Sequence, residues 1–286
     1  MQFQSWSKGN SSSAAVRSAQ VARRLVRRGL ARGTFSLNED RVLTTNPDGR
    51  ILYLDAADTS VTPSILTRRN YEPGTTRLLR RLVRPGSRVI EIGANIGWHT
   101  LTCAERVGPG GLVRAFEPNP RIFDILHTNI FVNAFWDRCV LEQRALGRSA
   151  GEAVLRIPGS FSGGANLRDR DASALAWMHQ DDVNVTVEVT TLDLALADNL
   201  SYDVMKIDAE GFEPEIFAGG ESFFDANPGL KMIMEFTPSM HGTDMLEWIA
   251  GRGLHVHAID RLGRTHRIGD TASLMHHMSV DLFITR

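Results

Sequence analysis

Two acidic residues, Glu91 and Glu117, constrain the fold of this chain more than any other feature of its sequence. Each closes a short apolar run, and the two stand 26 positions apart. Between them, residues 93–97 form a turn bounded by glycines, and a helix-like segment follows. This order indicates strand, tight loop, helix and strand, with both carboxylates at the carboxyl ends of neighbouring parallel strands. That edge is where open α/β sheets bind nucleotide-like ligands.

The rest of the chain continues the alternation of strands and helices. Strands are predicted at 88–92, 112–117, 139–145, 203–208, 230–236, 254–260 and 278–285, and helices at 96–106, 120–133, 212–218 and 243–251. Apolar strands that alternate with helices are typical of a parallel sheet covered on both faces. No helix-length pattern separates the last two strands, so we expect an antiparallel ending. The predicted fold is α/β, Rossmann-like, with a seven-stranded and mostly parallel sheet whose last strand is antiparallel.

Two segments are expected to add to this core. Residues 1–60 are predicted to form an N-terminal extension that consists of a basic amphipathic helix and a β-hairpin. Residues 61–286 are predicted to form the main domain, with an inserted flap at about 148–190 that is rich in Gly, Ser and Asp. A polar insertion beside the carboxyl edge of a sheet could act as a lid or be a solvated excursion. The hairpin strands are expected at 41–45 and 50–54, and the strands of the insertion at 152–157 and 183–190.

Composition and charge limit the classes of protein that remain. No run approaches the roughly 20 apolar residues that a membrane span needs. The two cysteines have no disulfide or zinc spacing, which favours a reducing compartment, and we expect the cytoplasm. The net charge of −1 hides an asymmetry, because residues 1–33 carry seven Lys and Arg and no acid. Residues 14–32 could therefore pack on the main domain, lie on an anionic membrane, dock on an acidic partner or serve as a transit peptide.

The glycine spacing distinguishes between nucleotide cofactors. A dinucleotide fingerprint, G-x-G-x-x-G, needs a third glycine for close packing of helix and strand. With Gly93 aligned as the first glycine, Trp98 stands at the third position. The pattern E-x-G-x-x-x-G instead suits S-adenosylmethionine, which has no pyrophosphate to bind.

S-adenosylmethionine places three demands on a binding site. Its ribose hydroxyls need an acid, and Glu117 is the candidate. Its methionine portion needs a close backbone approach, which the loop at 93–97 offers if Asn95 takes the left-handed conformation. Its sulfonium favours negative potential, which Glu91 and Asp208 can supply.

Several longer motifs are shared with one enzyme family. They are EIGANIGWHTL (91–101), AFEPNPRIFDILHTNI (115–130), RALG (144–147), TLDLAL (191–196) and MKIDAEGFEPEIFAGG (205–220). In these motifs the chain resembles the FkbM family of S-adenosylmethionine-dependent methyltransferases over roughly residues 70–237. The resemblance implies a class I methyltransferase fold and, for most members, O-methylation of a hydroxyl on a sugar, polyketide or other secondary metabolite. The first motif usually begins with Asp, where this chain has Glu91.

These motifs supply the candidate site residues. The predicted cofactor-binding residues are Glu72, Glu91, Gly93, Ala94, Asn95, Gly97, Trp98, Thr100, Glu117, Pro118, Asn119, Ala145 and Asp208. The candidate catalytic residues are Asp208, Glu210 and His99, because an attacking alcohol must lose its proton to a carboxylate or histidine. Further histidines that could act as the base are His179 and His241. Asp208 could instead bind the cofactor's ammonium group.

A metal-assisted variant would place Mg²⁺ between Asp208 and Glu235, where it could lower the pKa of the acceptor hydroxyl. The sequence offers no third oxygen ligand for it, so no metal is predicted. Glu213 has a simpler interpretation, as an acid near the N-terminus of the helix at 212–218.

The predicted activity is O-methylation of a small or glycosylated metabolite. One alternative is an NAD-dependent oxidoreductase on the same sheet, which Trp98 disfavours. Another is a non-catalytic cofactor-binding module whose basic helix is the interaction surface. Nucleic acid is not expected as a partner, since the positive charge is confined to one helix with few aromatic residues nearby. The sequence does not encode the oligomeric state.

Overall fold

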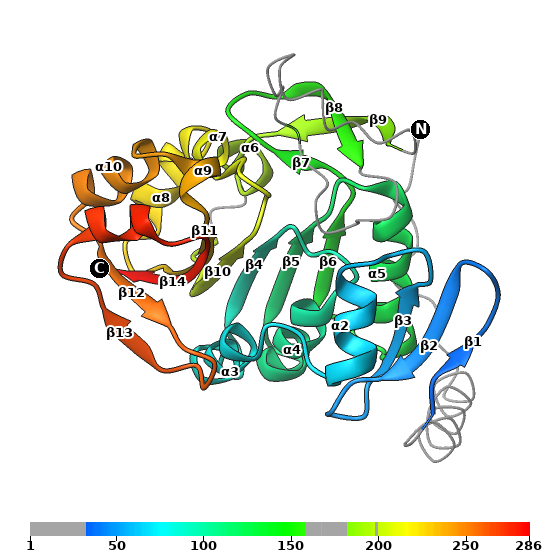
Figure 1. Cartoon of the computed structure of the whole chain (residues 1–286). Coiled ribbons are helices and arrows are strands. Elements are labelled where there is room, and N and C mark those ends of the chain that lie inside the picture. The colour runs from blue at the N-terminus through cyan, green and yellow to red at the C-terminus, as the bar shows by residue number, and fades with distance from the viewer. Residues whose placement is uncertain (1–32, 158–166, 168–181, 198–199) are drawn as a thin grey trace.

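An eight-stranded sheet forms the centre of the protein (Figure 1). The computed structural model describes residues 33–157, 167, 182–197 and 200–286, so the predicted helix at 14–32 and His179 lie outside the described residues. In spatial order the strands are β13 (Thr265–Arg267), β12 (His255–Ile259), β14 (Val280–Thr285), β11 (Lys231–Phe236), β10 (Val204–Ile207), β4 (Arg88–Ile92), β5 (Leu112–Phe116) and β6 (Cys139–Glu142).

The sheet is mostly parallel, as the sequence predicts. β11, β10, β4, β5 and β6 share one direction, whereas β14 lies between β11 and β12 and runs antiparallel to both. The seven predicted strands are all present, and β13 adds an eighth by pairing antiparallel with β12. β13 has only three residues, too few to show a period in the sequence. The strand predicted at 139–145 divides, because β6 ends at Glu142 and residues 145–146 join another sheet.

Helices cover both faces of this sheet. Val89 and Val204 point into one buried cluster, and their chain neighbours Ile90 and Met205 point into the other. Strands buried on both faces need apolar residues at successive positions, which explains their continuous apolar runs. The first cluster includes α3 (Pro73–Leu82), α4 (Trp98–Val107) and α5 (Pro120–Val132), and the second includes α7 (Glu213–Ala218), α8 (Glu221–Ala226) and α10 (Asp244–Gly251).

Several short elements complete the described part of the chain. They are α2 (Val61–Arg68), α6 (Leu192–Ala195), α9 (Pro238–His241) and the 3₁₀ helix η3 (Thr271–His276). α6, α8 and α9 have four to six residues, so they show too little periodicity to be predicted from sequence. Among the described helices, none is long and apolar enough to cross a membrane.

The N-terminal hairpin is attached to α5 by two asparagines. Asn129 bonds both the N–H and the C=O of Tyr53, and Asn133 does the same for Ile51. The two side-chain amides therefore substitute for a neighbouring strand along β3. The hairpin itself confirms the prediction, with β2 (Arg41–Thr45) antiparallel to β3 (Ile51–Asp55), and β1 (Phe35–Ser36) extends it. The division of the chain at residue 60 stays a prediction.

A small second sheet consists of β7 (Ala145–Leu146), β9 (Val183–Thr190) and β8 (Gly151–Ile157), in that order. β8 and β9 are antiparallel and agree with the strands expected in the insertion. Apart from Leu167, residues 158–181 between them lie outside the described residues. The flap at about 148–190 therefore stays a prediction.

Candidate active site

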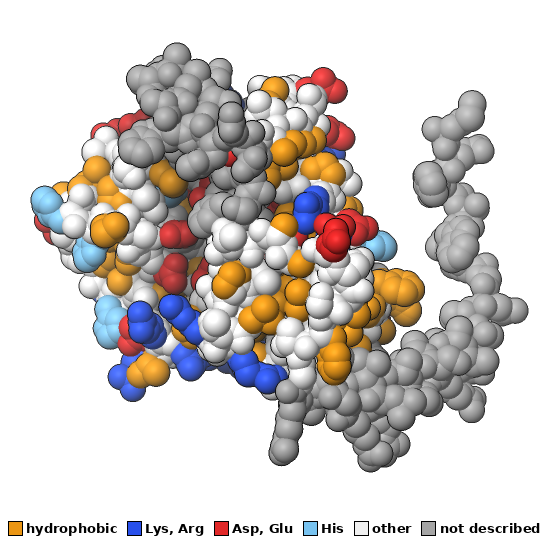
Figure 2. Space-filling model, turned by 45° about the vertical axis from the view of Figure 1, so that its right-hand side comes forward, with side chains coloured by type: hydrophobic (Ala, Val, Ile, Leu, Met, Phe, Trp, Pro, Cys, Tyr) orange, Lys and Arg blue, Asp and Glu red, His pale blue; other side chains and the backbone are white. Residues whose placement is uncertain are grey.

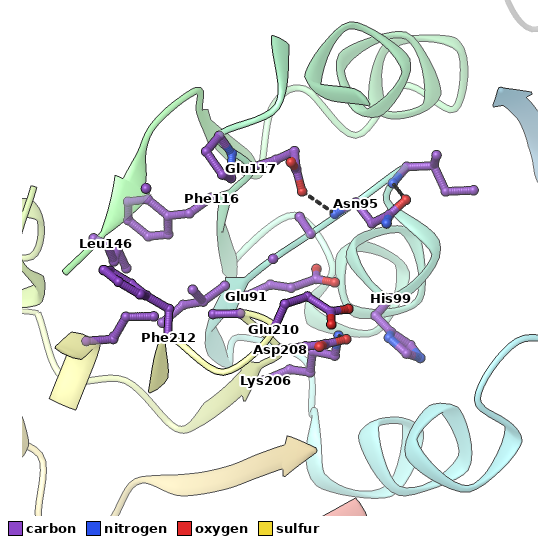
Figure 3. A pocket seen from close by; sticks show the side chains of 18 of the residues that line it. Glu91, Asn95, His99, Phe116, Glu117, Leu146, Lys206, Asp208, Glu210 and Phe212 are labelled. Atoms are coloured by element: carbon purple, nitrogen blue, oxygen red, sulfur yellow. Dashed lines mark hydrogen bonds and ion pairs between the residues drawn. The ribbon is translucent and has the colours of Figure 1, made fainter. Parts of the chain in front are cut away.

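A pocket opens at the carboxyl ends of β4, β5 and β10, where the sequence places the ligand. Figure 2 shows acidic side chains inside a hollow of the surface, and Figure 3 shows the pocket from close by. The predicted site residues that line it are Glu91, Gly93, Ala94, Asn95, Trp98, His99, Glu117, Pro118, Ala145, Asp208 and Glu210. The four that do not line it are Glu72, Gly97, Thr100 and Asn119.

The glycine loop brings two strand ends into close backbone contact. Gly93 has a φ of +72°, and a Cβ atom there would lie 1.8 Å from the carbonyl oxygen of Asp208. The amides of Gly93 and Ala94 both donate to the carbonyl of Phe116 at 3.0 Å. Asn95 has a φ of 49°, which confirms the predicted left-handed conformation. The loop therefore ties the ends of β4, β5 and β10 together, and only glycine fits at its first position.

Glu117 is held by the backbone on both carboxylate oxygens. Its Oε2 accepts from the amide of Asn95 and its Oε1 from the amide of Asn119, each at 2.9 Å. Burial raises the pKa of Glu117 to about 7, although the two amide hydrogen bonds oppose this shift. Each oxygen keeps further acceptor capacity beyond its one backbone bond. Asn119 thus orients the candidate ribose acid rather than lining the pocket.

Glu91 and Asp208 share one buried cation, Lys206. The Nζ of Lys206 donates to Oδ2 of Asp208 at 3.0 Å. Burial lowers the pKa of Lys206, but the carboxylates of Asp208, Glu72 and Glu91 outweigh it, so the net shift is upward and the ammonium stays charged. Burial raises the pKa of Glu91 to about 7. Thr100 donates to Oε2 of Glu91 at 2.6 Å and therefore acts on a carboxylate at the site rather than lining the pocket.

The loop after β10 presents Glu210 to the pocket in a left-handed conformation, with a φ of 52°. Burial and, to a smaller extent, the nearby carboxylates of Asp208 and Glu235 together raise the pKa of Glu210 to about 8. Figure 3 shows the carboxyl groups of Glu91, Asp208 and Glu210 close together on one side of the pocket. The pocket is therefore strongly acidic around Lys206, and the other cation among the described lining residues, Arg144, pairs with Glu142.

A buried pair behind this loop fixes its shape. Glu213 Oε1 accepts from the amide of Ala209 at 2.7 Å, and Glu213 Oε2 lies 2.7 Å from Nε2 of His241. Both side chains are almost completely buried. His241 also contacts the backbone of Thr237 at 2.9 Å, so it joins the segments that follow β10 and β11. Glu213 does lie near a helix N-terminus, as predicted, but its carboxylate binds these two partners. His241 does not line the pocket.

His99 lines the pocket but is held as a neutral, buried side chain. Its Nε2 lies 3.1 Å from Oγ1 of Thr76, which also accepts from Nε1 of Trp98 at 3.1 Å. Burial lowers the pKa of His99 well below its ordinary value, and Lys206 lowers it further. Glu72 lies behind it, with Oε2 at 3.7 Å from Nδ1 of His99. Glu72 therefore contacts the histidine and does not line the pocket, while burial raises its pKa to about 7.

Comparison with known proteins agrees with this arrangement. A model of the methyltransferase FkbM domain matches residues 91–256, which is more than half of the chain. The chain belongs to the FkbM methyltransferase family. It is therefore a methyltransferase that depends on S-adenosylmethionine. Comparison with curated proteins gave no match.

Comparison with solved structures gave matches at low identity and low TM-score. One is a TehB-like methyltransferase from Corynebacterium glutamicum, with 12% identity, coverage of 79% of this chain and 94% of that chain, and a TM-score of 0.44. Another is an O-methyltransferase from Bacillus cereus in complex with S-adenosylhomocysteine, with 15% identity, coverage of 79% and 86%, and a TM-score of 0.42.

The residues of the FkbM methyltransferase fit an adenosyl cofactor. Gly93 lines the pocket with backbone alone and lets the loop lie directly against Asp208, and the oxygens of Glu117 can accept further hydrogen bonds. An apolar end suits a flat base, and Figure 3 shows Phe116, Leu146 and Phe212 there. Sequence reasoning did not identify these three residues. Phe116 stands next to Glu117 in the motif AFEPNPRIFDILHTNI, and Leu146 stands next to Ala145 in RALG. These positions beside predicted site residues are the signal that could have identified them.

A metal site receives no support from the described residues. They contain no group of three or more His, Cys, Asp and Glu side chains placed to hold an ion. Glu235, the proposed partner of Asp208 in the Mg²⁺ alternative, accepts a hydrogen bond from Ser279.

Proposed function

We propose that this enzyme transfers the methyl group of S-adenosylmethionine to a hydroxyl of a small or glycosylated metabolite. The observation that carries the proposal is the conjunction of the Gly93 backbone, the carboxylate of Glu117 and the acids Asp208 and Glu210 in one pocket. When bound, the cofactor supplies a methyl group activated by a positive sulfur. The described residues supply binding, orientation and a proton acceptor, which are the remaining needs of a methyl transfer to oxygen.

In this proposal the two ends of the pocket have different roles. Glu117 accepts hydrogen bonds from the ribose hydroxyls of the cofactor. The apolar end of the pocket holds the adenine ring. The loop at 93–97 and the acids Glu91 and Asp208 surround the methionine portion. Asp208 is the proposed general base, because it faces the pocket. Lys206 bonds to its Oδ2, so Oδ1 is the oxygen that would accept the proton. In a methyl transfer to oxygen, Asp208 would accept the proton of the acceptor hydroxyl, while bound S-adenosylmethionine would supply the methyl group.

Cofactor binding is tested by titration calorimetry with S-adenosylhomocysteine. Replacing Glu117 by Gln keeps the side-chain shape and removes the charge, so we expect about 10- to 100-fold weaker binding from the loss of charge-assisted hydrogen bonds. Glu105→Gln is the control, since Glu105 is an exposed acid of α4. Equal affinities for the Glu117→Gln variant and the wild type would remove Glu117 from the site.

The role of the base is tested by turnover. Asp208→Asn should lower kcat about 100-fold or more while affinity for S-adenosylhomocysteine changes little. If Glu210→Gln has this effect and Asp208→Asn does not, the base is Glu210. Mass spectrometry of the product should locate the added methyl on oxygen. A methyl found on nitrogen would contradict the hydroxyl acceptor.

The pocket disfavours the NAD-dependent oxidoreductase, because the buried Trp98 stands at the third glycine position of a dinucleotide fingerprint. Cys103 and Cys139 are free thiols in the described part of the chain, which agrees with a reducing compartment. We infer a cytoplasmic location from this chemistry.

A further inference from the structure

Arginines gather on the outer surface where α3 meets the turn between β12 and β13. Arg77 and Arg81 of α3 donate hydrogen bonds to the backbone carbonyls of Arg261 and Gly263 in that turn. The contacts bring together side chains that are far apart in the sequence. The basic face consists of Arg77, Arg81, Arg84, Arg261 and Arg264, all of them exposed. Figure 2 shows Lys and Arg side chains gathered along the lower edge of the visible surface, below the acidic hollow.

The charge of the basic face is not neutralised by the protein. Within the described ranges, none of its five arginines forms an ion pair with a carboxylate. Asp48 pairs with Arg80 of α3, and Asp260, which precedes Arg261, lies with its Oδ2 3.2 Å from Nε2 of His266. Asp260 also accepts from two amides of the turn. All five arginines are exposed and none is in an ion pair within the described residues, so the face keeps an excess of positive charge, which is the pattern expected of a surface that binds anions.

An apolar side chain stands among these charges. Leu262 lies at the tip of the turn, two positions from Arg264 and next to Arg261, and it is 54% exposed. The turn is held by hydrogen bonds of 2.8 Å from Leu262 and Arg264 to Oδ1 of Asp260, and by one from Gly263 to the carbonyl of Asp260. The turn therefore presents a leucine in a fixed place between cationic side chains.

We propose that the basic face binds the surface of a membrane rich in anionic phospholipid, with Leu262 entering the headgroup layer. Arginine binds phosphate oxygens through two parallel hydrogen bonds, and juxtamembrane basic residues are attracted to anionic leaflets. An apolar tip flanked by cations suits an interface whose outer layer is anionic and whose inner layer is apolar. The exposed Leu262 at the tip offers nothing to a phosphate backbone, which favours a lipid interface over nucleic acid.

Residues 1–33 add a second basic segment to the same chain, with seven Lys and Arg and no acid. Peripheral binding is stable when two weak attachments act together, because the second binds at a high effective concentration. The seven cations of this segment are close together in the sequence, whereas the fold assembles the basic face from α3 and a distant turn. This inference is independent of the reaction that the pocket performs.

Vesicle flotation with the full chain tests the proposal. The wild type should bind vesicles in which about a third of the lipid is phosphatidylglycerol and should not bind pure phosphatidylcholine, with binding lost at about 0.5 M NaCl. Arg261→Glu/Arg264→Glu should weaken binding about 25-fold or more, at roughly fivefold for each charge removed. Leu262→Gln leaves the charge unchanged and should weaken binding about 10-fold.

The matched control reverses two charges elsewhere. Arg68 of α2 and Lys231 of β11 are exposed and lie outside the basic face, so Arg68→Glu/Lys231→Glu makes the same change in net charge. This control should retain most of the binding. Three results would overturn the proposal: no binding of the wild type to anionic vesicles, equal losses in the control and in Arg261→Glu/Arg264→Glu, or binding that neither of the two basic-face variants changes. Tighter binding to a short RNA or DNA duplex than to vesicles, unaffected by Leu262→Gln, would assign the face to nucleic acid instead.

Discussion

An alanine at Gly93 should damage this enzyme much more than an alanine at Gly86, although the two glycines have similar backbones. Their φ angles are +72° and +84°, both in the left-handed region that penalises a side chain. They differ in what surrounds them. A Cβ atom at Gly93 would lie 1.8 Å from the carbonyl oxygen of Asp208, whereas a Cβ atom at Gly86 would meet nothing within 4 Å. The pair therefore separates backbone strain from close approach.

The structure gives the size of the difference. Either substitution should lower the free energy of unfolding of the protein by about 1–2 kcal/mol, because an L-residue is strained in the left-handed region. In Gly93→Ala the distance from the new Cβ atom to the carbonyl oxygen of Asp208 must also grow by more than about 1 Å to reach an ordinary contact. Overpacking of this kind lowers the free energy of unfolding by about 1–3 kcal/mol more. Because the atom that must move belongs to Asp208, we expect a second effect on function. A shift of about 1 Å in the proposed base can lower turnover about 100-fold.

Urea unfolding and calorimetry with S-adenosylhomocysteine measure both effects. Gly86→Ala should unfold at slightly lower urea and keep wild-type affinity and turnover. Gly93→Ala should be less stable than Gly86→Ala and should bind and turn over poorly. If the two variants lose the same stability and Gly93→Ala keeps full activity, the close contact between the ends of β4 and β10 does not shape the site, and the reasoning is wrong.

Three further outcomes follow from buried polar contacts. Asn129→Ala removes both bonds to the backbone of Tyr53, so we expect a loss of about 2–4 kcal/mol and faster amide exchange at Tyr53 by mass spectrometry. His241→Ala leaves the buried carboxylate of Glu213 without its histidine partner and should lower the free energy of unfolding by about 3–5 kcal/mol. In a double-mutant cycle, Glu213→Gln/His241→Gln should lose less stability than the sum of the losses in Glu213→Gln and His241→Gln. The pKa of Glu117 rises from 4.5 to about 7, so its contribution to the stability of the cofactor-free protein is complete below pH about 4.5 and lost as the pH rises through about 7. Glu117→Gln should flatten that part of the stability curve in chemical denaturation.

The parts of the site that could be predicted from sequence are those with short-range causes. Gly93 and Asn95 have positive φ because a tight strand-to-helix turn demands it, and such a turn shows in the glycine spacing. Glu91 and Glu117 stand where two apolar runs end, which places both at the carboxyl edge of a parallel sheet. The main strands followed from continuous apolar runs in the same way.

The parts that could not be predicted depend on contacts between distant residues. Nothing near Glu213 in the sequence indicates that its carboxylate meets His241, 28 positions later. Thr100 and Asn119 are predicted to bind the cofactor, and the fold shows that they also donate hydrogen bonds to the carboxylates of Glu91 and Glu117. A motif shows which residues belong to a site, and it does not distinguish those that face the ligand from those that hold them.

The acidity of the pocket has a consequence for the two forms of the cofactor. Burial of carboxyl groups around the ammonium of Lys206 is unfavourable in the empty protein and raises the pKa of Glu91, Glu117 and Glu210. A bound sulfonium would offset this repulsion, whereas the thioether that remains after transfer carries no charge at sulfur. We therefore expect tighter binding of S-adenosylmethionine than of S-adenosylhomocysteine, with proton release on binding at a pH near 7, where these carboxyl groups are partly protonated. Calorimetry in two buffers of different ionisation enthalpy measures the released protons. Equal affinities and no proton release would show that the acids do not act on the sulfur, and that their negative charge serves the acceptor instead.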